Sequence, residues 1–570
     1  MKRIIPLALA VAAANSIAQD DTMEHVLVTV PLHKSTAETA LPVTVLTGDE
    51  LRRAVTATIG DTLANTPGIA NASFGPGVGQ PVVRGQQGPR VVVLQNGTSS
   101  ADVAGLSGDH AVSVEPLLAD SIEVLRGPST LLYGGGAIGG VVNVLDNRVP
   151  TSLPEELDGA LEYRHDTASD LDNVVGRVEG SAGQFAFHAD FLYRDYNDLD
   201  IPGLANREHD EHDEDHDEDH DEHEGEEHDE HGEEENTDGF IANTGGRAKS
   251  FTLGGAYHFD SGFVGLAVNR LENEYGIPAG AHEHEEEHGD EDHDEDHDED
   301  HEGEEHEGED HDHEEEEEGG ISLDIEQTRY DAIVHLHNPF EFLEVARGFL
   351  TYTDYEHAEI EGSGEVGTEF ERDTWEGRLE LVHKPMGNFH GVFGMQAVID
   401  DFSAVGEEAY IPQTDSTELG FFLVEDFHAG DFTYEFGLRY DWVEREPSRG
   451  LDDSESFNSL SGSGAVLWDV SEGWQLGAAL SRSERAPSVE ELYSNAGNFG
   501  PDEWVEHAAT GAIELGDGDL DTEVSNNADL SLRWLGDGHW VDVTAFYNDF
   551  SDYINLVNTG IEVDETPVRQ

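Results

Sequence analysis

Apolar and polar residues alternate along most of this chain from about residue 157 onward, in segments of 9 to 16 residues separated by Gly, Asp and Asn. In Gln184 to Arg194 the odd positions are apolar, while His188, Asp190 and Arg194 lie at even positions. The segment Thr433 to Trp442 repeats the scheme with aromatic residues at even positions. A period of two predicts β-strands that have one apolar and one polar face.

These strands predict a transmembrane antiparallel β-barrel. Aromatic residues facing lipid and polar residues facing a lumen fit an outer-membrane barrel, because closure leaves no backbone edge unpaired in hydrocarbon. A soluble β-sandwich also alternates, but its strands are usually shorter. We count about 16 strands, of which Val541 to Tyr547 is the last clear one. The sequence then stops at Gln570 without a final strand that ends in an aromatic residue, so we expect an open barrel.

The first 18 residues predict a cleaved signal peptide. Lys2 and Arg3 precede the apolar run Ile4 to Ala14, and Ser16-Ile17-Ala18 offers small residues before a cut. No apolar run reaches the 18 or so residues that a membrane-spanning helix requires. The sequence has no cysteine, which excludes disulfide staples and a lipid anchor on cysteine.

Residues 19–40 and 41–150 lie between the signal peptide and the strands and lack their alternation. The second region is glycine-rich, with a possible helix at Gly48 to Thr66 and short apolar runs at Arg90 to Leu94 and Ser121 to Leu125. We expect a small globular α+β domain at 41–150, followed by the barrel at 151–570.

Four motifs in this region resemble the plug of TonB-dependent outer-membrane receptors. They are Thr47 to Leu51 leading to Asn65 to Ile69, then Val83 to Gln86, then Ile122 to Ser129, and Leu132 to Gly134 followed by Val141 to Val144. The resemblance implies that residues 41–150 form a plug inside the barrel lumen. The family closes 22 strands, so we expect the C-terminal strands, roughly six, to be missing from this sequence.

Upstream of the plug, Glu24 to Val30 resembles the TonB box. Its β-prone residues can add as a strand to the sheet edge of a partner; they are Val26, Leu27, Val28, Thr29 and Val30. We therefore expect residues 19–40 to form a periplasmic tail that binds TonB and its inner-membrane energising complex, without a signalling extension.

Two runs, Glu208 to Glu235 and His282 to Glu318, consist almost entirely of His, Asp and Glu. Together they hold 16 of the 30 histidines and 44 of the 125 acids. Imidazole beside carboxylate is the ligand set of zinc, nickel and copper. The runs fall in stretches 205–238 and 279–320, which we expect to be disordered extracellular loops because they cannot bury apolar surface. The alternative to metal binding is that the runs are solvated acidic segments in which the histidines are incidental.

Histidines recur every four residues within these runs and predict many weak, exchangeable cation sites that weaken as imidazole protonates below a pH of roughly 6.5. The residues concerned are His212, His216, His220, His293, His297 and His301. The net charge of -97 leaves about -53 outside the runs. That excess excludes nucleic acid as a partner and is equally explained by a saline habitat.

The segment Ser481 to Tyr493, with His507 to Thr510, is similar to the zinc-uptake branch of these receptors. The resemblance implies that the adjacent Asp109 and His110, together with His507, hold a metal ion above the plug. Three further candidates follow. Glu365 lies in the predicted loop between Tyr355 and Phe370, and His282 and His284 stand where a loop leaves the barrel rim. A hydrogen-bonded or solvated loop histidine is the alternative for each.

We therefore expect a receptor in the outer membrane that imports a divalent transition metal, zinc first. Its partners are TonB, outer-membrane lipid and the metal ion, and no cofactor is permanently bound. One alternative is a receptor for a metal chelate or siderophore that carries iron or nickel. Another is a metal-buffering or adhesion protein anchored by its barrel. No catalytic set emerges, since there is no cysteine nucleophile and no GxSxG, and Gly134 to Gly140 lacks the Lys-Ser/Thr of a phosphate loop.

Overall fold

The structure is a computed structural model. It describes residues 39, 41–134, 136–205, 237–278, 320–406, 408–448, 454–496, 500–507, 510–536, 539–563 and 566–570. The signal peptide, residues 24–30 and both His-rich runs, with His282 and His284, lie outside these residues, so the predictions made for them stay predictions. Among the described residues no helix is long and apolar enough to cross a membrane.

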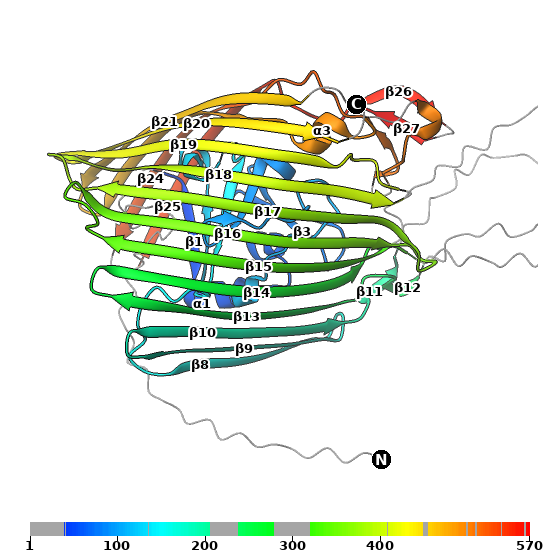
Figure 1. Cartoon of the computed structure of the whole chain (residues 1–570), viewed down its shortest axis with the longest axis horizontal. Helices are drawn as coiled ribbons and strands as arrows, with labels where there is room; N and C mark the ends of the chain where they lie inside the picture. Colours follow the sequence, from blue (N-terminus) through cyan, green and yellow to red (C-terminus); the bar gives the residue numbers. More distant parts are fainter. Residues whose placement is uncertain are drawn as a thin grey trace, which may run out of the picture.

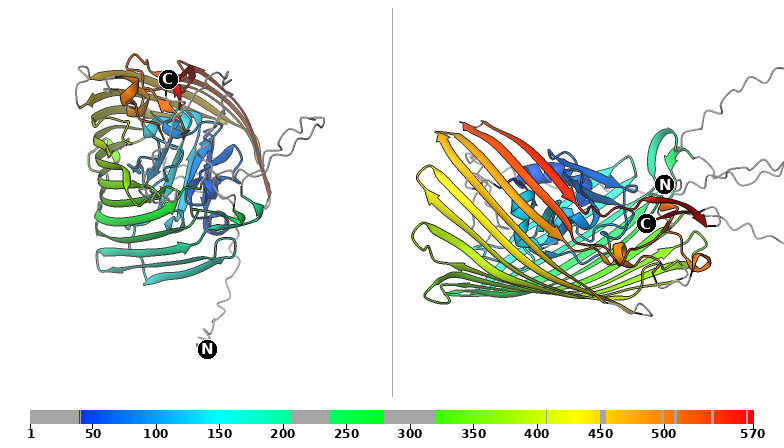
Figure 2. Two further views of the ribbon diagram at one scale, coloured as in Figure 1. Left: turned by 90° about the vertical axis from the view of Figure 1, so that its right-hand side faces the viewer. Right: turned by 90° about the horizontal axis from the view of Figure 1, so that it is seen from above.

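Fifteen antiparallel strands form one large sheet that curves around a smaller domain (Figures 1 and 2). About 16 strands were predicted, and the last of them is in place as β25. The strands are β8 (Asp158–Asp166), β9 (Leu171–Ala182), β10 (Phe185–Tyr196), β13 (Gly246–Phe259), β14 (Gly262–Gly276), β15 (Ser322–His337), β16 (Leu343–Ile360), β17 (Val366–His383), β18 (Phe389–Gly406), β19 (Thr414–Ala429), β20 (Phe432–Pro447), β21 (Glu455–Ser471), β22 (Trp474–Arg485), β24 (Glu523–Gly536) and β25 (His539–Ser551). Among the described residues β8 and β25 are the end strands, each with one neighbour in the sheet.

The predicted alternation determines which side chains face the lumen. In β10, Phe185 and Phe191 are exposed on the outer surface, whereas His188 and Arg194 are buried. β20 follows the same rule, since Arg439 and Asp441 are buried and Phe436 is exposed. In both strands the outer face is therefore apolar and the buried charged residues lie on the inner face, as the pattern predicted.

The two ends of the barrel sheet differ in their connections. At one end, called here the short-turn end, the strands are joined by brief turns at 183–184, 260–261, 430–431 and 472–473. The other end, the long-loop end, carries the connections 197–245, 277–321, 407–413 and 486–522. Both His-rich runs thus lie between strand ends at the long-loop end. Outer-membrane barrels place such long connections outside the cell and short turns in the periplasm.

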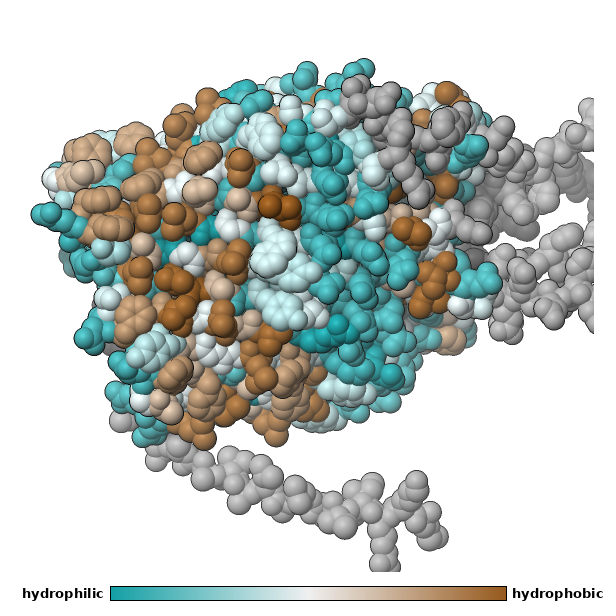
Figure 3. Space-filling view, viewed as in Figure 1, coloured by the Kyte–Doolittle hydropathy of each residue, from teal (hydrophilic) through white to brown (hydrophobic). Residues whose placement is uncertain are grey.

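The outer surface is divided into two bands. On the face shown in Figure 3, apolar side chains gather over the half near the short-turn end, and hydrophilic ones predominate over the half near the long-loop end. The strands β16, β17 and β18 are 18 residues long, while a tilted strand needs only about 9–11 residues to cross the hydrocarbon. The barrel wall therefore extends beyond the lipid toward the long-loop end.

The smaller domain is built on a five-stranded sheet in the order β1-β6-β7-β4-β5, in which only β4 and β7 are parallel. Its elements are β1 (Val43–Thr47), α1 (Gly48–Ala54), α2 (Ile59–Leu63), β2 (Ile69–Ser73), β3 (Gly79–Val83), η2 (Gly88–Arg90), β4 (Val91–Gln95), β5 (Thr98–Ser99), η3 (Pro116–Leu118), β6 (Ser121–Leu125), η4 (Gly127–Tyr133) and β7 (Gly140–Leu145). The views in Figure 2 place this domain inside the curve of the large sheet.

The predicted helix at Gly48 to Thr66 is wrong as a single element, because it is split into α1 and α2. The intervening residues include two threonines and a valine, whose branched side chains disfavour helix. Thr58 ends the break as the N-cap of α2, where its side chain accepts a hydrogen bond from the backbone N–H of Asp61. The two short helices can then pack on one face of the plug sheet.

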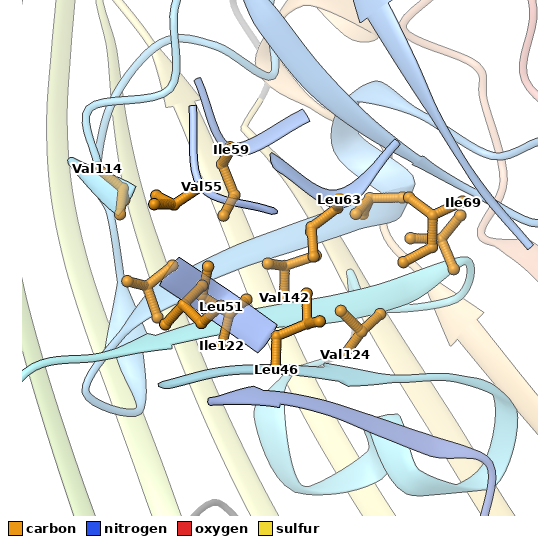
Figure 4. Close-up of a cluster of buried hydrophobic side chains, with 13 residues drawn as sticks. Leu46, Leu51, Val55, Ile59, Leu63, Ile69, Val114, Ile122, Val124 and Val142 are labelled. Atoms are coloured by element: carbon orange, nitrogen blue, oxygen red, sulfur yellow. The ribbon is translucent and has the colours of Figure 1, made fainter. Parts of the chain in front are cut away.

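The plug has its own apolar core between these helices and the sheet. Leu51 of α1 and Leu63 of α2 pack against Ile122 and Val124 of β6 and Val142 of β7 (Figure 4). Leu63, Ile122, Val124 and Val142 are fully buried. The inner domain is thus a folded unit with its own hydrophobic core, and further apolar side chains of the plug pack against the barrel wall.

Buried ion pairs join the plug to the barrel wall. Arg84, after β3, pairs with Asp529 of β24, and each side chain is only 4% exposed. Arg90 donates from Nε to Glu523 of β24 at 2.9 Å, and Glu523 also accepts from Arg485 of β22. Because unpaired charges are costly in such places, these contacts fix the plug against β22 and β24.

The remaining elements lie near the long-loop end. They are β11 (Leu199–Leu204), which pairs with β12 (Asp238–Ile241), the helical turns α3 (Val489–Tyr493) and η5 (Pro501–Glu503), and the small sheet of β23 (Ile513–Glu514), β26 (Asn558–Val563) and β27 (Thr566–Arg569).

Candidate metal centre

A plug loop between β5 and η3 carries Asp109 and His110 toward the long-loop end of the barrel. The side-chain amide of Gln80 in β3 donates to the carbonyls of Ala104, Ser107 and His110 at 2.8, 2.7 and 3.0 Å. From the wall, the hydroxyl of Tyr275 in β14 donates to the carbonyl of Asp109 at 3.2 Å. The loop is therefore fixed from both the plug and the barrel.

The imidazole of His110 is buried with both nitrogens engaged. Nδ1 lies 3.2 Å from the carbonyl of Val103 and donates to it, because a carbonyl can only accept. Nε2 lies 2.9 Å from Oε1 of Glu359 and 3.9 Å from Oδ1 of Asp109. Nε2 therefore faces two carboxylates, while a carbonyl holds Nδ1. This is the environment of an imidazole that ligates a metal through one nitrogen and is oriented through the other.

The barrel supplies two more donors from one strand. His357 and Glu359 of β16 lie two residues apart, so the alternation turns both toward the lumen. The ring centroids of His110 and His357 are 4.7 Å apart. His357 Nδ1 lies 3.2 Å from the hydroxyl of Tyr355, and its Nε2, although buried, has no hydrogen-bond partner among the described residues.

His110, His357 and Glu359 form a group, called here the apex cluster, whose three ligand atoms all lie within 4.8 Å of one another. Two ligands bound to one tetrahedral zinc at ~2.1 Å are ~3.4 Å apart, so a small closure of the side chains brings three ligands onto one ion. Phe370 packs against both imidazoles at 5.4 Å. The cluster offers two imidazoles and a carboxylate in a largely dry place, with the carboxylate of Asp109 beside it.

His507 lies beside the apex cluster, in the connection between β22 and β24. Its Nε2 is 3.1 Å from the hydroxyl of Ser107, which itself donates to Oδ1 of Asp109. Its Nδ1 is 3.2 Å from Oε2 of Glu514, but the two atoms are not aligned as a hydrogen bond. The ring stacks on Tyr410 with 4.9 Å between centroids. The sequence thus placed Asp109, His110 and His507 together, and the structure has them as neighbours.

The electrostatics of this region reflect an excess of carboxylates. Burial alone would lower the pKa of His110, but Asp109 and Glu359 outweigh it and raise that pKa to about 9. Burial would raise the pKa of Asp109, yet the two neighbouring histidines and Ser107 bring it below its usual value. Burial and then Glu514, Glu491 and Asp109 raise the pKa of Glu490 well above its usual range. A cation at this place would be stabilised by its surroundings.

The other predicted ligands lie elsewhere. Glu365 is exposed in the tight connection between β16 and β17, where its backbone carbonyl accepts from the N–H of Glu361 at 2.9 Å. It is not among the three residues of the apex cluster. The histidines of the two runs fall outside the described residues.

Sequence reasoning missed His357 and Glu359. The one available signal was the period of two in β16, which puts positions 355, 357 and 359 on the polar face that looks into the lumen. Which lumen-facing residues meet the plug loop depends on contacts 249 positions apart in the sequence, such as that between His110 and Glu359.

Comparisons with known proteins agree with this architecture. The family described as TonB dependent receptor-like, beta-barrel, matches residues 231–567, and the TonB-dependent Receptor Plug Domain matches residues 35–141. Similar solved structures include the copper transporter OprC, with a TM-score of 0.68, 14% identity and coverage of 92% of this chain and 75% of that chain. The FrpB iron transporter from Neisseria meningitidis (F3-3 variant) has a TM-score of 0.65, 14% identity and coverage of 93% and 74%. The siderophore receptor PirA from Pseudomonas aeruginosa has 0.61, 14%, 93% and 78%.

At such identities the solved structures show the fold, and the family rests on the two matches, of which the barrel alone covers more than half of the sequence. The chain belongs to the TonB-dependent receptors, transporters of the Gram-negative outer membrane that are not enzymes.

Proposed function

We propose that this receptor imports a divalent transition metal as the ion, zinc first. The observation that carries the proposal is the apex cluster, where His110 of the plug meets His357 and Glu359 of the wall within 4.8 Å. A ligand held between plug and barrel is bound by both, so a movement of the plug changes its coordination. Such an arrangement suits uptake, in which the ion must be held and then released.

The donor atoms support zinc over softer or harder ions. Imidazole with carboxylate suits zinc, nickel and divalent copper, whereas monovalent copper prefers thiolate and thioether, and calcium prefers oxygen alone. The sequence has no cysteine and only four methionines. The related folds include transporters of copper and of iron, so the choice among borderline metals rests on the cluster and not on those relatives.

A chelate or siderophore is a weaker candidate because the donors are buried and close together. His110 is 2% exposed and His357 is 1% exposed. The nearby arginine that could recognise an anionic chelate, Arg372, is already bound by Asp400 at 2.8 and 3.1 Å and by the carbonyl of Asp102. Room for one ion is therefore more easily made here than room for an organic ligand.

Transport requires energy from TonB, and we assign the contact to Val26 to Val30. The segment precedes the plug in the sequence, and its β-prone residues can pair with the sheet edge of a partner. The His-rich runs act as weak collectors at the long-loop end, where both run between strand ends.

The test is growth and metal content of cells under zinc limitation, with and without the chain. We expect cellular zinc to fall when the chain is absent and when His110 or His357 is changed to alanine. Deletion of residues 24–30 separates uptake from buffering, since a buffering or adhesion protein would retain its metal while a transporter would stop importing. Unchanged zinc together with a fall in iron or nickel would overturn zinc as the cargo.

A further inference from the structure

The hydrogen bonds of Ser107 determine where the proton of His507 lies. Ser107 has one hydroxyl proton, and it donates that proton to Oδ1 of Asp109. The hydroxyl oxygen must then accept at its other contact, 3.1 Å away, which is Nε2 of His507. Nε2 therefore donates to Ser107, and Nδ1 is the nitrogen left to bind a ligand.

Nδ1 of His507 faces a carboxylate. Nδ1 of His507 lies 3.2 Å from Oε2 of Glu514, yet the pair is not aligned as a hydrogen bond, and Nδ1 has no hydrogen-bond partner among the described residues. A buried nitrogen without a hydrogen-bond partner thus lies beside a buried carboxylate, and a cation held between the two would satisfy both. His507 is 7% exposed and Glu514 is 2% exposed, so water offers little screening.

The neighbouring contacts hold both groups in this orientation. Thr510 donates through its hydroxyl to the other oxygen of Glu514 at 2.9 Å. The backbone N–H of His507 donates to the carbonyl of Ala512 at 3.0 Å. This bridge between His507 and Ala512 keeps His507 close to Glu514. The chain of Asp109, Ser107 and Nε2 resembles the carboxylate-supported histidines that ligate metals through their second nitrogen.

His507 is therefore not available to the apex cluster through Nε2, which is committed to Ser107. The sequence led us to expect that Asp109, His110 and His507 share one ion. The contacts instead divide the donors into two groups that meet at Asp109, whose Oδ1 is 3.9 Å from His110 Nε2 and accepts from Ser107 on the other side.

We propose that the apex holds two divalent cations side by side, the second bound by Nδ1 of His507 and the carboxylate of Glu514, with water completing its shell. This inference rests on the proposed function, because it assumes that the apex cluster holds the first ion. With only two protein ligands, the second site is the weaker and more exchangeable of the two, as a transfer position next to the main site requires.

The experiment is zinc-edge anomalous diffraction from crystals of the full chain soaked with zinc alone. We expect two separate peaks, one at the apex cluster and one between His507 and Glu514. In E514Q the second peak is lost and the first retained, and in H357F the reverse holds. The matched control H428A removes an exposed histidine of β19 far from the apex, at the short-turn end, and keeps both peaks. Heat-modifiable migration on gels checks that each barrel is folded.

Each outcome decides between the two proposals. A peak at the apex cluster without one at His507 overturns the second site and leaves zinc import standing. A single peak that contacts both His110 and His507 does the same. No peak at either place overturns the proposed function itself. The wild-type crystal alone distinguishes these results if a variant fails to fold.

Discussion

Replacement of His357 by phenylalanine removes a metal ligand and little else. The ring packs between His110, at 4.7 Å, and Phe370, at 5.4 Å, so a second aromatic ring of similar size fits the same space. Among the described residues, the one hydrogen bond lost is that between Nδ1 and the hydroxyl of Tyr355, which is worth about 1 kcal/mol. The barrel should therefore fold normally.

The effect on zinc should be much larger than the effect on folding. Groups that merely orient a metal ligand are worth roughly 10- to 100-fold in affinity, and a direct ligand is worth at least as much as the upper figure. We expect H357F to weaken zinc binding at the apex by ~100-fold or more, which is about 2.7 kcal/mol.

The assay is competition with a chromophoric chelator, on the purified full chain, at a free zinc concentration low enough to leave the weak sites of the His-rich runs empty. The matched control is H428A, because His428 is a histidine of β19 that lies at the short-turn end and is 58% exposed. H428A should bind zinc like the parent. If H357F folds and binds zinc as tightly as H428A does, the assignment of the apex cluster is wrong.

Three further predictions follow from the same contacts. R84A should destabilise the folded chain by about 3–5 kcal/mol in denaturant titration, because it leaves Asp529 buried and unpaired. The control K249A, which breaks the exposed pair with Glu272, should cost no more than about 1 kcal/mol. Equal effects would contradict the stabilising role of the buried pair between Arg84 and Asp529. Since the pKa of His110 is raised to about 9, the ring is protonated at neutral pH and zinc must displace that proton. The zinc affinity should therefore rise with pH up to about 9, by as much as tenfold per pH unit. Calorimetry in buffers of different ionisation enthalpy should count the released proton, and zinc binding without proton release would refute the role of His110. Deletion of residues 24–30 should abolish zinc accumulation while leaving zinc binding by the purified chain unchanged, and uptake that persists would show that TonB acts elsewhere.

The strands and their faces could be predicted because alternation is a local property. A period of two places Phe185 outside and His188 inside whatever the neighbouring strands do. The prediction of a single helix at Gly48 to Thr66 was wrong for a local reason as well, since branched residues and the N-cap Thr58 interrupt the helix. Such signals are present in the sequence and can be weighed without tertiary information.

The site could be predicted only in part because it is made by docking one domain into another. Asp109, His110 and His507 carried a family resemblance, but nothing near Glu359 distinguishes it from Glu365 until the strand boundary at Ile360 is known. Glu365 falls just beyond that boundary, in the turn, and Glu359 falls on the last inward position of the strand. A shift of six residues thus separates an exposed carboxylate from one that belongs to the apex cluster.

The charge balance at the apex explains why a divalent ion suits this place. Without metal, the proton on His110 is the positive charge between Asp109 and Glu359. Exchange of that proton for a divalent ion leaves two carboxylates opposite two positive charges, so the site becomes neutral where a monovalent ion would leave it negative. Gln80 holds the loop through the carbonyl of His110 and two others, and it belongs to β3 of the plug. On the proposed function, a pull on the plug that displaces β3 would withdraw His110 from the wall, which keeps His357 and Glu359, and the ion would lose its ligand from the plug as the plug moves.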